Sequence, residues 1–337
     1  MSTTKAAATP PPTRRHAQRS ASRIALVIVS KYGTLFAMAI MVVIFGLAIP
    51  NYAFLQTSNL LAIVNQSALT AIIAVGLTLV LVVGEMDLSI GYAASLAGII
   101  VAGLMAKQGL PMPAAILATL LMGGVIGTVN GLIVTKARVN AVVATLGVGT
   151  VLVGLSYGYT SGSPITEVPK GFANLTLGSF IGIQNPIWYM LAVLVVLWVI
   201  LNRTPLGQRM QAVGSNKGAA RLAGIRTDRV TIAAFVIGGV CAALTGILLA
   251  SLLGSGTVSA ADGYLLDSFA AVFLGAATLR DGEFHVIGTF IGVLVVNIGF
   301  NGLSLFGTPT FWQFVFKGGI LVLAVALSTI ARRYSKI

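Results

Sequence analysis

Two carboxylates interrupt a long apolar stretch in the segment Gly84–Gly91, which reads G-E-M-D-L-S-I-G. Charged groups are costly inside a membrane, so Glu85 and Asp87 are candidates for a function such as hydrogen bonding to a polyol, together with the hydroxyl of Ser89. The flanking glycines permit a broken or re-entrant backbone, which is tolerated only where protein or a watery cavity covers it. A second interpretation is a cytoplasmic turn in which Asp87 caps the next helix. Both interpretations are open at this point.

Other polar side chains lie in or near apolar segments. Asparagine carries both a donor and an acceptor, which suits sugar hydroxyls but also suits a link between neighbouring helices. An unpaired charge in a membrane helix is expensive, so Asp267 and Lys317 are expected to have partners, and a mutual ion pair is one possibility. We add the following residues to the candidate translocation pathway: Asn65, Asn130, Asp267, Asn297, Asn301 and Lys317.

The segment 203–229 differs from a plain charged loop. It combines short amphipathic pieces, broken at Gly214 and Gly224, with six basic residues and a single acid, Asp228. A loop that only sets topology would need the charge but not this ordered pattern. The segment is therefore predicted to dock a cytoplasmic partner.

The composition defines the class of protein. Of the 337 residues, 57% are hydrophobic and only 9% are charged, whereas an ordinary soluble domain carries about 25% charged residues. A soluble globular fold is thereby excluded. The net charge of +13 is spread between apolar runs rather than gathered on one compact face, which argues against nucleic acid as a partner.

The sequence also lacks the residues that enzymes and cofactor sites need. The single Cys241 rules out a disulfide framework and a cysteine-based metal site. No P-loop motif, metal-ligand cluster or nucleophile–base–acid arrangement is present. The chain is therefore expected to be neither an enzyme nor a cofactor-binding protein, and any ATP hydrolysis is expected on a partner chain.

The elements that position these residues are membrane-spanning helices. A helix needs about 20 mostly apolar residues to cross the hydrocarbon core. An all-α polytopic membrane protein with about ten helices is predicted, at 32–49, 60–83, 88–106, 112–135, 141–160, 186–202, 230–252, 264–280, 284–304 and 310–330. Residues 1–31 are predicted to be a disordered basic tail, 32–330 the transmembrane domain, and 331–337 a short C-terminal segment. An inverted repeat is predicted between the second to fifth and the seventh to tenth helices.

Positive charges in the connections predict the orientation. With the N-terminus inside, 18 of the 21 lysines and arginines lie on the cytoplasmic side, Lys107 and Lys170 lie outside, and Lys317 lies within the last helix. Both termini are therefore predicted to be cytoplasmic.

Glycines spaced four residues apart predict close helix contacts. They occur at Gly123, Gly127 and Gly131, at 154 and 158, and at 288 and 292. Small residues let helix backbones approach closely, which favours packing seams, and a pore lining is the alternative.

Four sequence blocks together resemble a known family. They are Gly84–Gly91, 129–134 with 143–147, 204–225, and 267–275 with Asn301-Gly302 and Lys317-Gly318. They resemble the permease subunits of bacterial ABC importers of the ribose, xylose and arabinose type, in the branched-chain amino acid and sugar permease superfamily. The resemblance covers residues 32–330 and adds Thr145 to the candidate pathway.

The resemblance implies the transmembrane subunit of an ATP-driven importer that moves a monosaccharide or similar polyol across the bacterial inner membrane. It implies three partners: a second permease copy, a periplasmic sugar-binding protein, and a cytoplasmic ATPase that binds the loop 203–229. The implied coupling residues are Thr204, Gly207, Arg209, Gly214, Asn216, Ala219, Ala220, Arg221, Gly224 and Ile225.

Other functions remain open from the sequence. A branched-chain amino acid permease of the same superfamily is the nearest alternative, although the Asp87-Leu88-Ser89 signature favours sugar. A secondary transporter would need an ion site and would leave the docking pattern unexplained. A passive channel is disfavoured because no ring-forming repeat of polar residues is visible.

Overall fold

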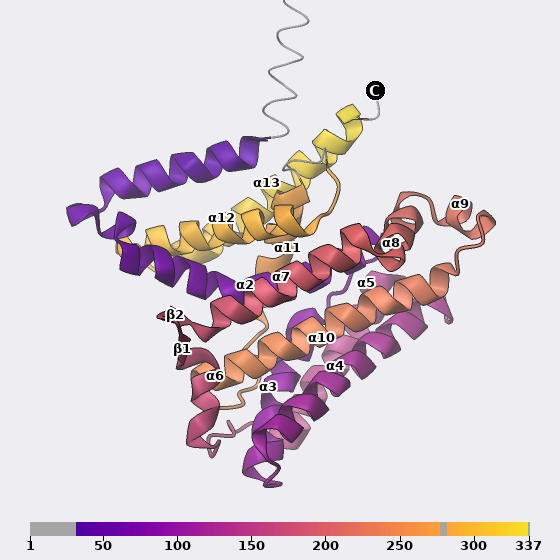
Figure 1. Cartoon of the computed structure of the whole chain (residues 1–337), viewed down its shortest axis with the longest axis horizontal. Helices are drawn as coiled ribbons and strands as arrows, with labels where there is room; N and C mark the ends of the chain where they lie inside the picture. Colours follow the sequence, from indigo (N-terminus) through magenta and orange to yellow (C-terminus); the bar gives the residue numbers. More distant parts are fainter. Residues whose placement is uncertain (1–31, 277–281, 336–337) are drawn as a thin grey trace, which may run out of the picture.

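The computed structural model describes residues 32–276 and 282–335, and these residues are almost entirely helical (Figure 1). Helices occupy each of the ten predicted segments, with ends that differ by a few residues. The predicted tail 1–31, residues 277–280 of the predicted eighth helix, and residues 336–337 lie outside the described part. The helices are Tyr32–Ala48, η1 (Pro50–Leu55), α2 (Thr57–Val82), α3 (Ile90–Ala106), α4 (Met112–Thr135), α5 (Ala141–Thr160), η2 (Lys170–Ala173), α6 (Asn174–Leu177), α7 (Asn185–Arg203), α8 (Pro205–Ser215), α9 (Lys217–Leu222), α10 (Thr227–Leu253), α11 (Gly263–Ala276), α12 (Val286–Leu305) and α13 (Phe311–Ser335).

Six of these helices, α2, α4, α5, α7, α10 and α12, are long and apolar enough to cross a membrane. The remaining apolar stretches, at Tyr32–Ala48, α3, α11 and Phe311–Ala326, are shorter. The described residues thus form a mainly helical protein with several helices that can span a membrane, and the count of ten crossings stays a prediction.

Helices α2 and α10 form the centre of the molecule. Both are apolar around most of their circumference, which is the pattern of a helix covered on all sides. Helix α10 packs against α2, α3 and α4, and α2 also packs against α7, α11 and α12. Gly76 of α2 lies directly against Cys241 of α10. The side chains that face these two helices are therefore held from several directions.

The first helix of each predicted repeat unit packs against the other unit. Helices α3, α4 and α5 contact one another, and so do α11, α12 and α13. Helix α2, from the first half, packs on α11 and α12, while α10, from the second half, packs on α3 and α4. This reciprocal arrangement is the one that an internal repeat would produce, and the repeat itself stays a prediction.

Two of the three glycine patterns are packing seams. Gly123, Gly127 and Gly131 of α4 lie against α10, where Gly127 faces the carbonyl of Phe235. The pair at 288 and 292 lies in the same way against α11. A side chain at these positions would collide with a neighbouring helix, which confirms the predicted role. By contrast, the pair at 154 and 158 of α5 has no described atom within 4 Å of where a Cβ would stand.

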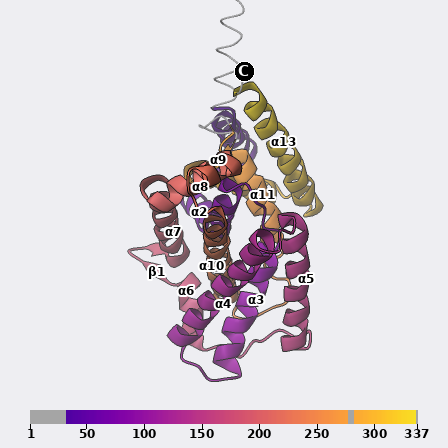
Figure 2. The same cartoon turned by 90° about the vertical axis from the view of Figure 1, so that its right-hand side faces the viewer.

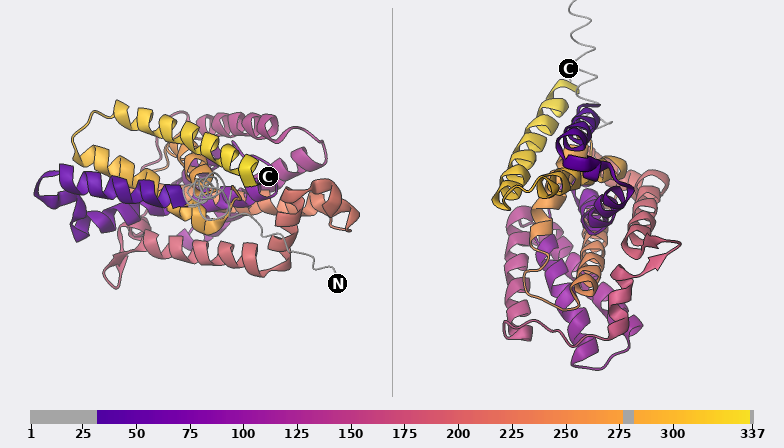
Figure 3. Two further views of the ribbon diagram at one scale, coloured as in Figure 1. Left: turned by 90° about the horizontal axis from the view of Figure 1, so that it is seen from above. Right: turned by 90° about the vertical axis from the view of Figure 1, so that its left-hand side faces the viewer.

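The two ends of the helix bundle carry different structures. Helices α8 and α9 lie at one end of α7 and α10, and α6 with the hairpin of β1 (Ser179–Phe180) and β2 (Ile183–Gln184) lies at the other (Figure 1). Seen from above, α13 and α5 run along one side of the molecule and α7 along the other (Figure 3). The hairpin, η2 and α6 were not predicted, because short polar elements leave no strong periodic pattern.

The prediction that the loop 203–229 breaks at Gly214 is wrong. Helix α8 continues through Gly214 to Ser215, and the break falls at Asn216. Asn216 has an extended backbone, and its Oδ1 accepts a hydrogen bond of 2.9 Å from the Ala219 N–H, so it caps α9. The second predicted break is correct, since Gly224 follows α9 with a φ of +81°.

Candidate functional site

Asp87 lies in a buried connection between α2 and α3. Its side chain is 2% exposed, and its Oδ1 accepts hydrogen bonds from Ser89 N–H at 2.9 Å and Ser89 Oγ at 2.6 Å. Burial raises the pKa of the Asp87 carboxyl above its ordinary value, and the hydrogen bonds from Ser89 and Asn130 oppose this rise. Asp87 therefore holds the buried turn before α3, but the prediction that it caps this helix is wrong, because the N-cap is Ser89 and no side chain caps the first turn.

This turn is linked to two further helices. Asn130 of α4 donates from Nδ2 to Ser89 Oγ at 2.8 Å. The Leu88 N–H donates to Thr145 Oγ1 of α5 at 2.9 Å. Four predicted pathway residues, Asp87, Ser89, Asn130 and Thr145, thus form one buried network that ties the starts of α3 and α5 to α4. We call these four residues the turn network.

The cytoplasmic loop touches the turn directly. Lys217 Nζ, at the start of α9, forms an ion pair of 2.9 Å with Glu85 Oε1. Gly214 of α8 lies against the backbone carbonyl of Val82 at the end of α2, so close that a Cβ would not fit. Gly84, with a φ of +85°, then turns the chain away from α2. Residues of the loop and of the turn therefore form one contact surface.

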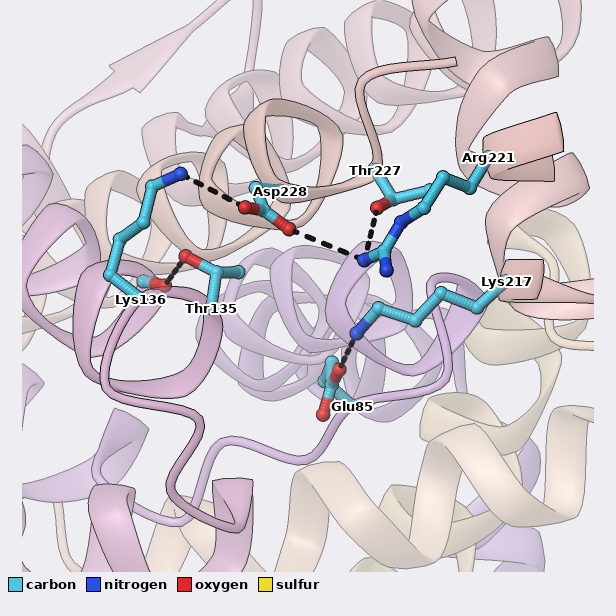
Figure 4. A network of polar contacts seen from close by, with 8 residues as sticks. Glu85, Thr135, Lys136, Lys217, Arg221, Thr227 and Asp228 are labelled. Carbon is cyan, nitrogen blue, oxygen red and sulfur yellow. Dashed lines mark hydrogen bonds and ion pairs between the residues drawn. The ribbon is translucent and has the colours of Figure 1, made fainter. Parts of the chain in front are cut away.

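A second ion pair stands beside the first one. Asp228 at the start of α10 pairs with Lys136 at 2.9 Å and approaches Arg221 at 4.0 Å, and Arg221 also donates to Thr227 Oγ1 at 3.4 Å (Figure 4). A cavity of about 430 Å³ is lined by Glu85, Lys217, Arg221 and Asp228. The charged side chains in Figure 4 come from the residue just after α4, from α9 and α10, and from the turn, so the ion pairs bridge four parts of the chain.

The other predicted coupling residues shape α8 and α9. Thr204 Oγ1 accepts from the Gly207 N–H at 3.3 Å and caps α8. Gly207 fits against the carbonyl of Leu201 at the end of α7, and Ala220 is buried. Arg209 and Ile225 line a groove of about 810 Å³ between α8 and the start of α10, and Ala219 supplies the N–H that Asn216 caps.

The remaining pathway residues gather elsewhere. A cavity of about 350 Å³, here called the α2–α12 cavity, lies nearer the hairpin end of the bundle and contains Asn65, Asp267 and Asn297. Asp267 Oδ1 forms an ion pair of 2.7 Å with Lys317 Nζ, so the possible mutual pairing is confirmed. The full lining is Asn65, Gln66, Leu69, Thr70, Thr176, Pro186, Leu252, Tyr264, Asp267, Asn297 and Phe300.

Asn301 belongs to neither group. It exchanges two hydrogen bonds of 3.0 Å with Asn59 and so links α12 to α2. This is the helix-linking role that the sequence left open for each asparagine.

Two aromatic residues of the α2–α12 cavity, Tyr264 and Phe300, were not predicted as site residues. Tyr264 lies three residues before Asp267, and Phe300 lies three residues after Asn297. Residues three apart share a helix face, so this spacing could have identified both residues.

Comparisons with known proteins cover most of the chain. The family model described as "Branched-chain amino acid transport system / permease component" matches residues 59–325. The chain is 38% identical over 302 residues to the ribose import permease protein of Bacillus subtilis (strain 168), which covers 89% of this chain and 93% of that protein. It is 33% identical over 297 residues to the D-allose transport system permease protein of Escherichia coli (strain K12), covering 88% and 91%. It is 31% identical over 298 residues to the L-arabinose ABC transporter permease protein of Azospirillum brasilense, covering 88% and 87%. No solved structure matches the chain.

Proposed function

The chain belongs to the family of permease components of branched-chain amino acid transport systems, and on this premise we propose that it is the membrane-spanning subunit of an ATP-driven sugar importer. The observation that carries the proposal is similarity over nearly the whole length to permeases named for ribose, allose and arabinose. These names favour a sugar over a branched-chain amino acid. The chain is thus a multi-pass membrane protein of the inner membrane and a transport subunit rather than an enzyme.

The loop 203–229 receives the ATPase in this proposal. Two contacts support it: the Lys217–Glu85 ion pair and the close approach of Gly214 to Val82. A partner that moves α8 and α9 therefore moves the turn between α2 and α3. The turn network passes this displacement to α3, α4 and α5, because Ser89 and Leu88 hydrogen-bond to α4 and α5.

Transport then follows from a shift between two states. ATP-bound and ATP-free forms of the ATPase would bind the loop with different affinities in the inward-open and outward-open permease. Only such a difference in affinity can change the populations of the two states. The chain supplies the element that moves, and the nucleotide chemistry belongs to the partner.

A second copy of the permease would pack on the side formed by α5 and α13. Both helices lie on the same side of the molecule, away from α7 and β1 (Figure 2). The outward face of α5 carries Gly147, Gly154 and Gly158, which no other described residue covers. Glycine faces permit close helix contacts in membranes, and this face makes none with the part of the chain that the structure describes.

A periplasmic sugar-binding protein would dock at the opposite end from α8 and α9. The proposal places the hairpin end outside and both termini in the cytoplasm. It is supported by the clustering of Arg138, Lys217 and Arg221 around one cavity at the other end, since basic connections face the cytoplasm.

Proteoliposomes test the function. They contain the permease, the ATPase and the binding protein encoded beside it, and uptake of radiolabelled D-ribose, D-allose, L-arabinose and D-galactose is measured. We expect uptake of at least one sugar that requires ATP on the ATPase side and is unaffected when ion gradients are collapsed. Uptake that an ion gradient drives without the ATPase would show a secondary transporter instead.

A further inference from the structure

The α2–α12 cavity has the composition of a carbohydrate site within a single permease chain. We propose that it binds one neutral monosaccharide during transport, between the binding protein and the cytoplasm. The inference rests on the proposed sugar import and assigns that function a site. The volume of the α2–α12 cavity, about 350 Å³, falls in the range of about 300–1,000 Å³ typical of small-molecule pockets.

The polar groups of the cavity match hydroxyl groups. Asn65 Oδ1 is fully enclosed and has no hydrogen-bond partner among the described residues. Leaving such an acceptor unpaired is costly, so a ligand that brings a donor would be favoured. Asn297 donates to the Val293 carbonyl at 3.0 Å, which fixes the orientation of its amide beside Asp267. A carboxylate and two amides together offer acceptors and donors to several hydroxyls of one ring.

The apolar lining matches the other surface of a sugar. Tyr264 and Phe300 bring aromatic rings to the cavity from α11 and α12, and Leu69 and Leu252 lie beside them. The faces of a sugar ring carry C–H groups, which pack on apolar side chains while the hydroxyls at the rim reach the polar ones. A mainly apolar wall with a few placed polar groups is the usual form of a small-molecule site.

The charges of the cavity favour a ligand without net charge. Asp267 is the only ionisable carboxylate or amine among the described lining residues, and Lys317 neutralises it at 2.7 Å. Lys317 also donates to the Gly263 carbonyl at 3.2 Å, so its ammonium group is held in place. A sugar phosphate would need an additional cation, whereas a neutral sugar needs only hydrogen bonds.

A second cavity offers a route to the site. It has a volume of about 330 Å³, shares Asn65 and Gln66 with the α2–α12 cavity, and reaches Gly182 and Gln184 of the hairpin. A sugar released at the hairpin end would pass along α2 to reach Asp267. Gln66 lies at the junction of the two cavities and is exposed.

Protection of a single cysteine tests the site. Cys241→Ala removes the only cysteine and keeps the Cβ that packs on Gly76, and Gln66→Cys then reports access to the junction. The full chain in membrane vesicles is treated with a small thiol reagent, with millimolar D-ribose, D-allose, L-arabinose, D-galactose or L-leucine present. We expect one of the sugars to slow the reaction at least fivefold. Ser163→Cys, an exposed site that lines neither cavity, is the control and should react at the same rate with every solute.

The role of Asp267 is tested in the same assay. Asp267→Asn should raise the sugar concentration needed for half-maximal protection of the cysteine by about ten- to a hundredfold. This is the effect expected for the loss of a hydrogen bond to a charged group. Because this variant leaves Lys317 without its counter-charge, the double variant Asp267→Asn/Lys317→Gln removes both charges and restores neutral packing. The double variant should remain defective. If the sugar protects the cysteine of the double variant at the same concentration as in the parent protein, Asp267 serves only the fold, and its role as a hydrogen-bond acceptor for the sugar is refuted.

The outcomes separate this proposal from the import function. Sugar uptake in proteoliposomes without protection by any sugar would overturn the site and leave the function standing. Protection by L-leucine alone would contradict a sugar as the ligand of the cavity and as the substrate of the importer. Protection by a sugar without ATP-dependent uptake would leave the site standing and overturn the import mechanism.

Discussion

At the scale of single residues, Asp87 accepts hydrogen bonds through one carboxylate oxygen. Both hydrogen bonds from Ser89 reach the same atom, Oδ1. An asparagine has an equivalent Oδ1 and can accept both bonds without a charge. The geometry therefore indicates that position 87 needs an acceptor, and that the negative charge is not needed.

Asp87→Asn is expected to keep uptake within about twofold of the parent, whereas Asp87→Ala is expected to abolish uptake while the protein still inserts. Alanine leaves the buried Ser89 N–H without an acceptor, which costs about 1–3 kcal/mol. Transport assays in proteoliposomes and quantification of the protein in the membrane provide the measurement. If both variants insert normally but neither transports, the charge itself is required in the transport cycle.

The pH dependence of stability provides a second test of Asp87. Burial raises its pKa above the ordinary 3.8, so the folded protein binds this proton more tightly than the unfolded chain. The resulting stabilisation is complete below the ordinary pKa and is lost as the pH rises through the raised value. We expect the thermal stability of the parent protein in detergent to fall more over this window than that of Asp87→Asn. Equal pH profiles for the two proteins would contradict the raised pKa.

At the scale of elements, the contact between the loop 203–229 and the turn is the connection through which the partner acts. The Lys217–Glu85 pair is partly exposed, with side-chain exposures of 43% and 17%. Exposed ion pairs add only about 0–1 kcal/mol to stability. Its substitution should therefore affect coupling more than folding.

We expect Glu85→Lys and Lys217→Glu each to reduce ATP-driven uptake several-fold, and the exchanged pair in the double variant to recover it. The physical reason is that each single variant replaces the ion pair of 2.9 Å between α9 and the turn by two like charges, which repel each other. Lys136→Glu is the matched control, because its partner Asp228 lies on α10 and the pair does not touch the turn. A double variant as defective as the single variants would exclude the ion pair from coupling.

Gly214→Ala, and still more Gly214→Pro, should uncouple transport without unfolding the membrane helices. A Cβ at this position collides with the Val82 carbonyl, so α8 must move away from α2. The expected result is a folded permease whose uptake is lost and whose ATPase no longer co-purifies. Gly218→Ala on the exposed surface of α9 is the control. Normal uptake and normal ATPase binding in both Gly214 variants would refute the docking role.

At the scale of the whole molecule, much of the helical framework could be predicted from the sequence. Long apolar runs specify where helices lie, because a lipid-covered helix needs about 20 apolar residues. The break at Asn216 and the hairpin could not be predicted in this way. They depend on capping and on packing against α2 and α7, which leave only weak local signals.

The sequence predicts which polar residues belong to the candidate site, but it does not predict which of them lie together in the structure. Asp87, Asn65 and Asn297 all looked alike as polar groups among apolar ones. Only the packing of α2 on α11 and α12 brings Asn65 and Asn297 to one cavity and leaves Asp87 in another network. Asn301, one turn from Asn297, is instead used to pair with Asn59.

Cysteine labelling tests the orientation of the whole chain. In the Cys241→Ala background, a cysteine at Lys170 should react with an impermeant reagent added to intact cells, and a cysteine at Lys217 should be protected. The reason is that the basic connections cluster at the end that holds Lys217. The reverse labelling pattern would invert the topology.

The assembly of two copies is tested by cross-linking. A cysteine at Gly154 should form a disulfide between two copies in oxidising conditions, because the outward face of α5 is uncovered in a single chain. Val195→Cys on α7 is the matched control, since Val195 is 60% exposed and α7 runs along the opposite side of the molecule from α5 (Figure 3). Efficient cross-linking through Val195 and none through Gly154 would place the dimer contact elsewhere.

The exchange of α2 and α10 between the two halves has a consequence for biogenesis. Helix α2 leaves the ribosome long before α11 and α12 exist, so it must reside in lipid without its final neighbours. Until then its hydroxyl and amide groups lack their final hydrogen-bond partners. The hydrogen bond of 2.7 Å between Thr78 and Thr289, for example, can form only when the last third of the chain has been inserted. Native contacts so distant in sequence form late. A chain that stops after α10 would therefore leave uncovered the side of α2 that packs on α11 and α12, so the fold of the first half is complete only after the last helices have been inserted.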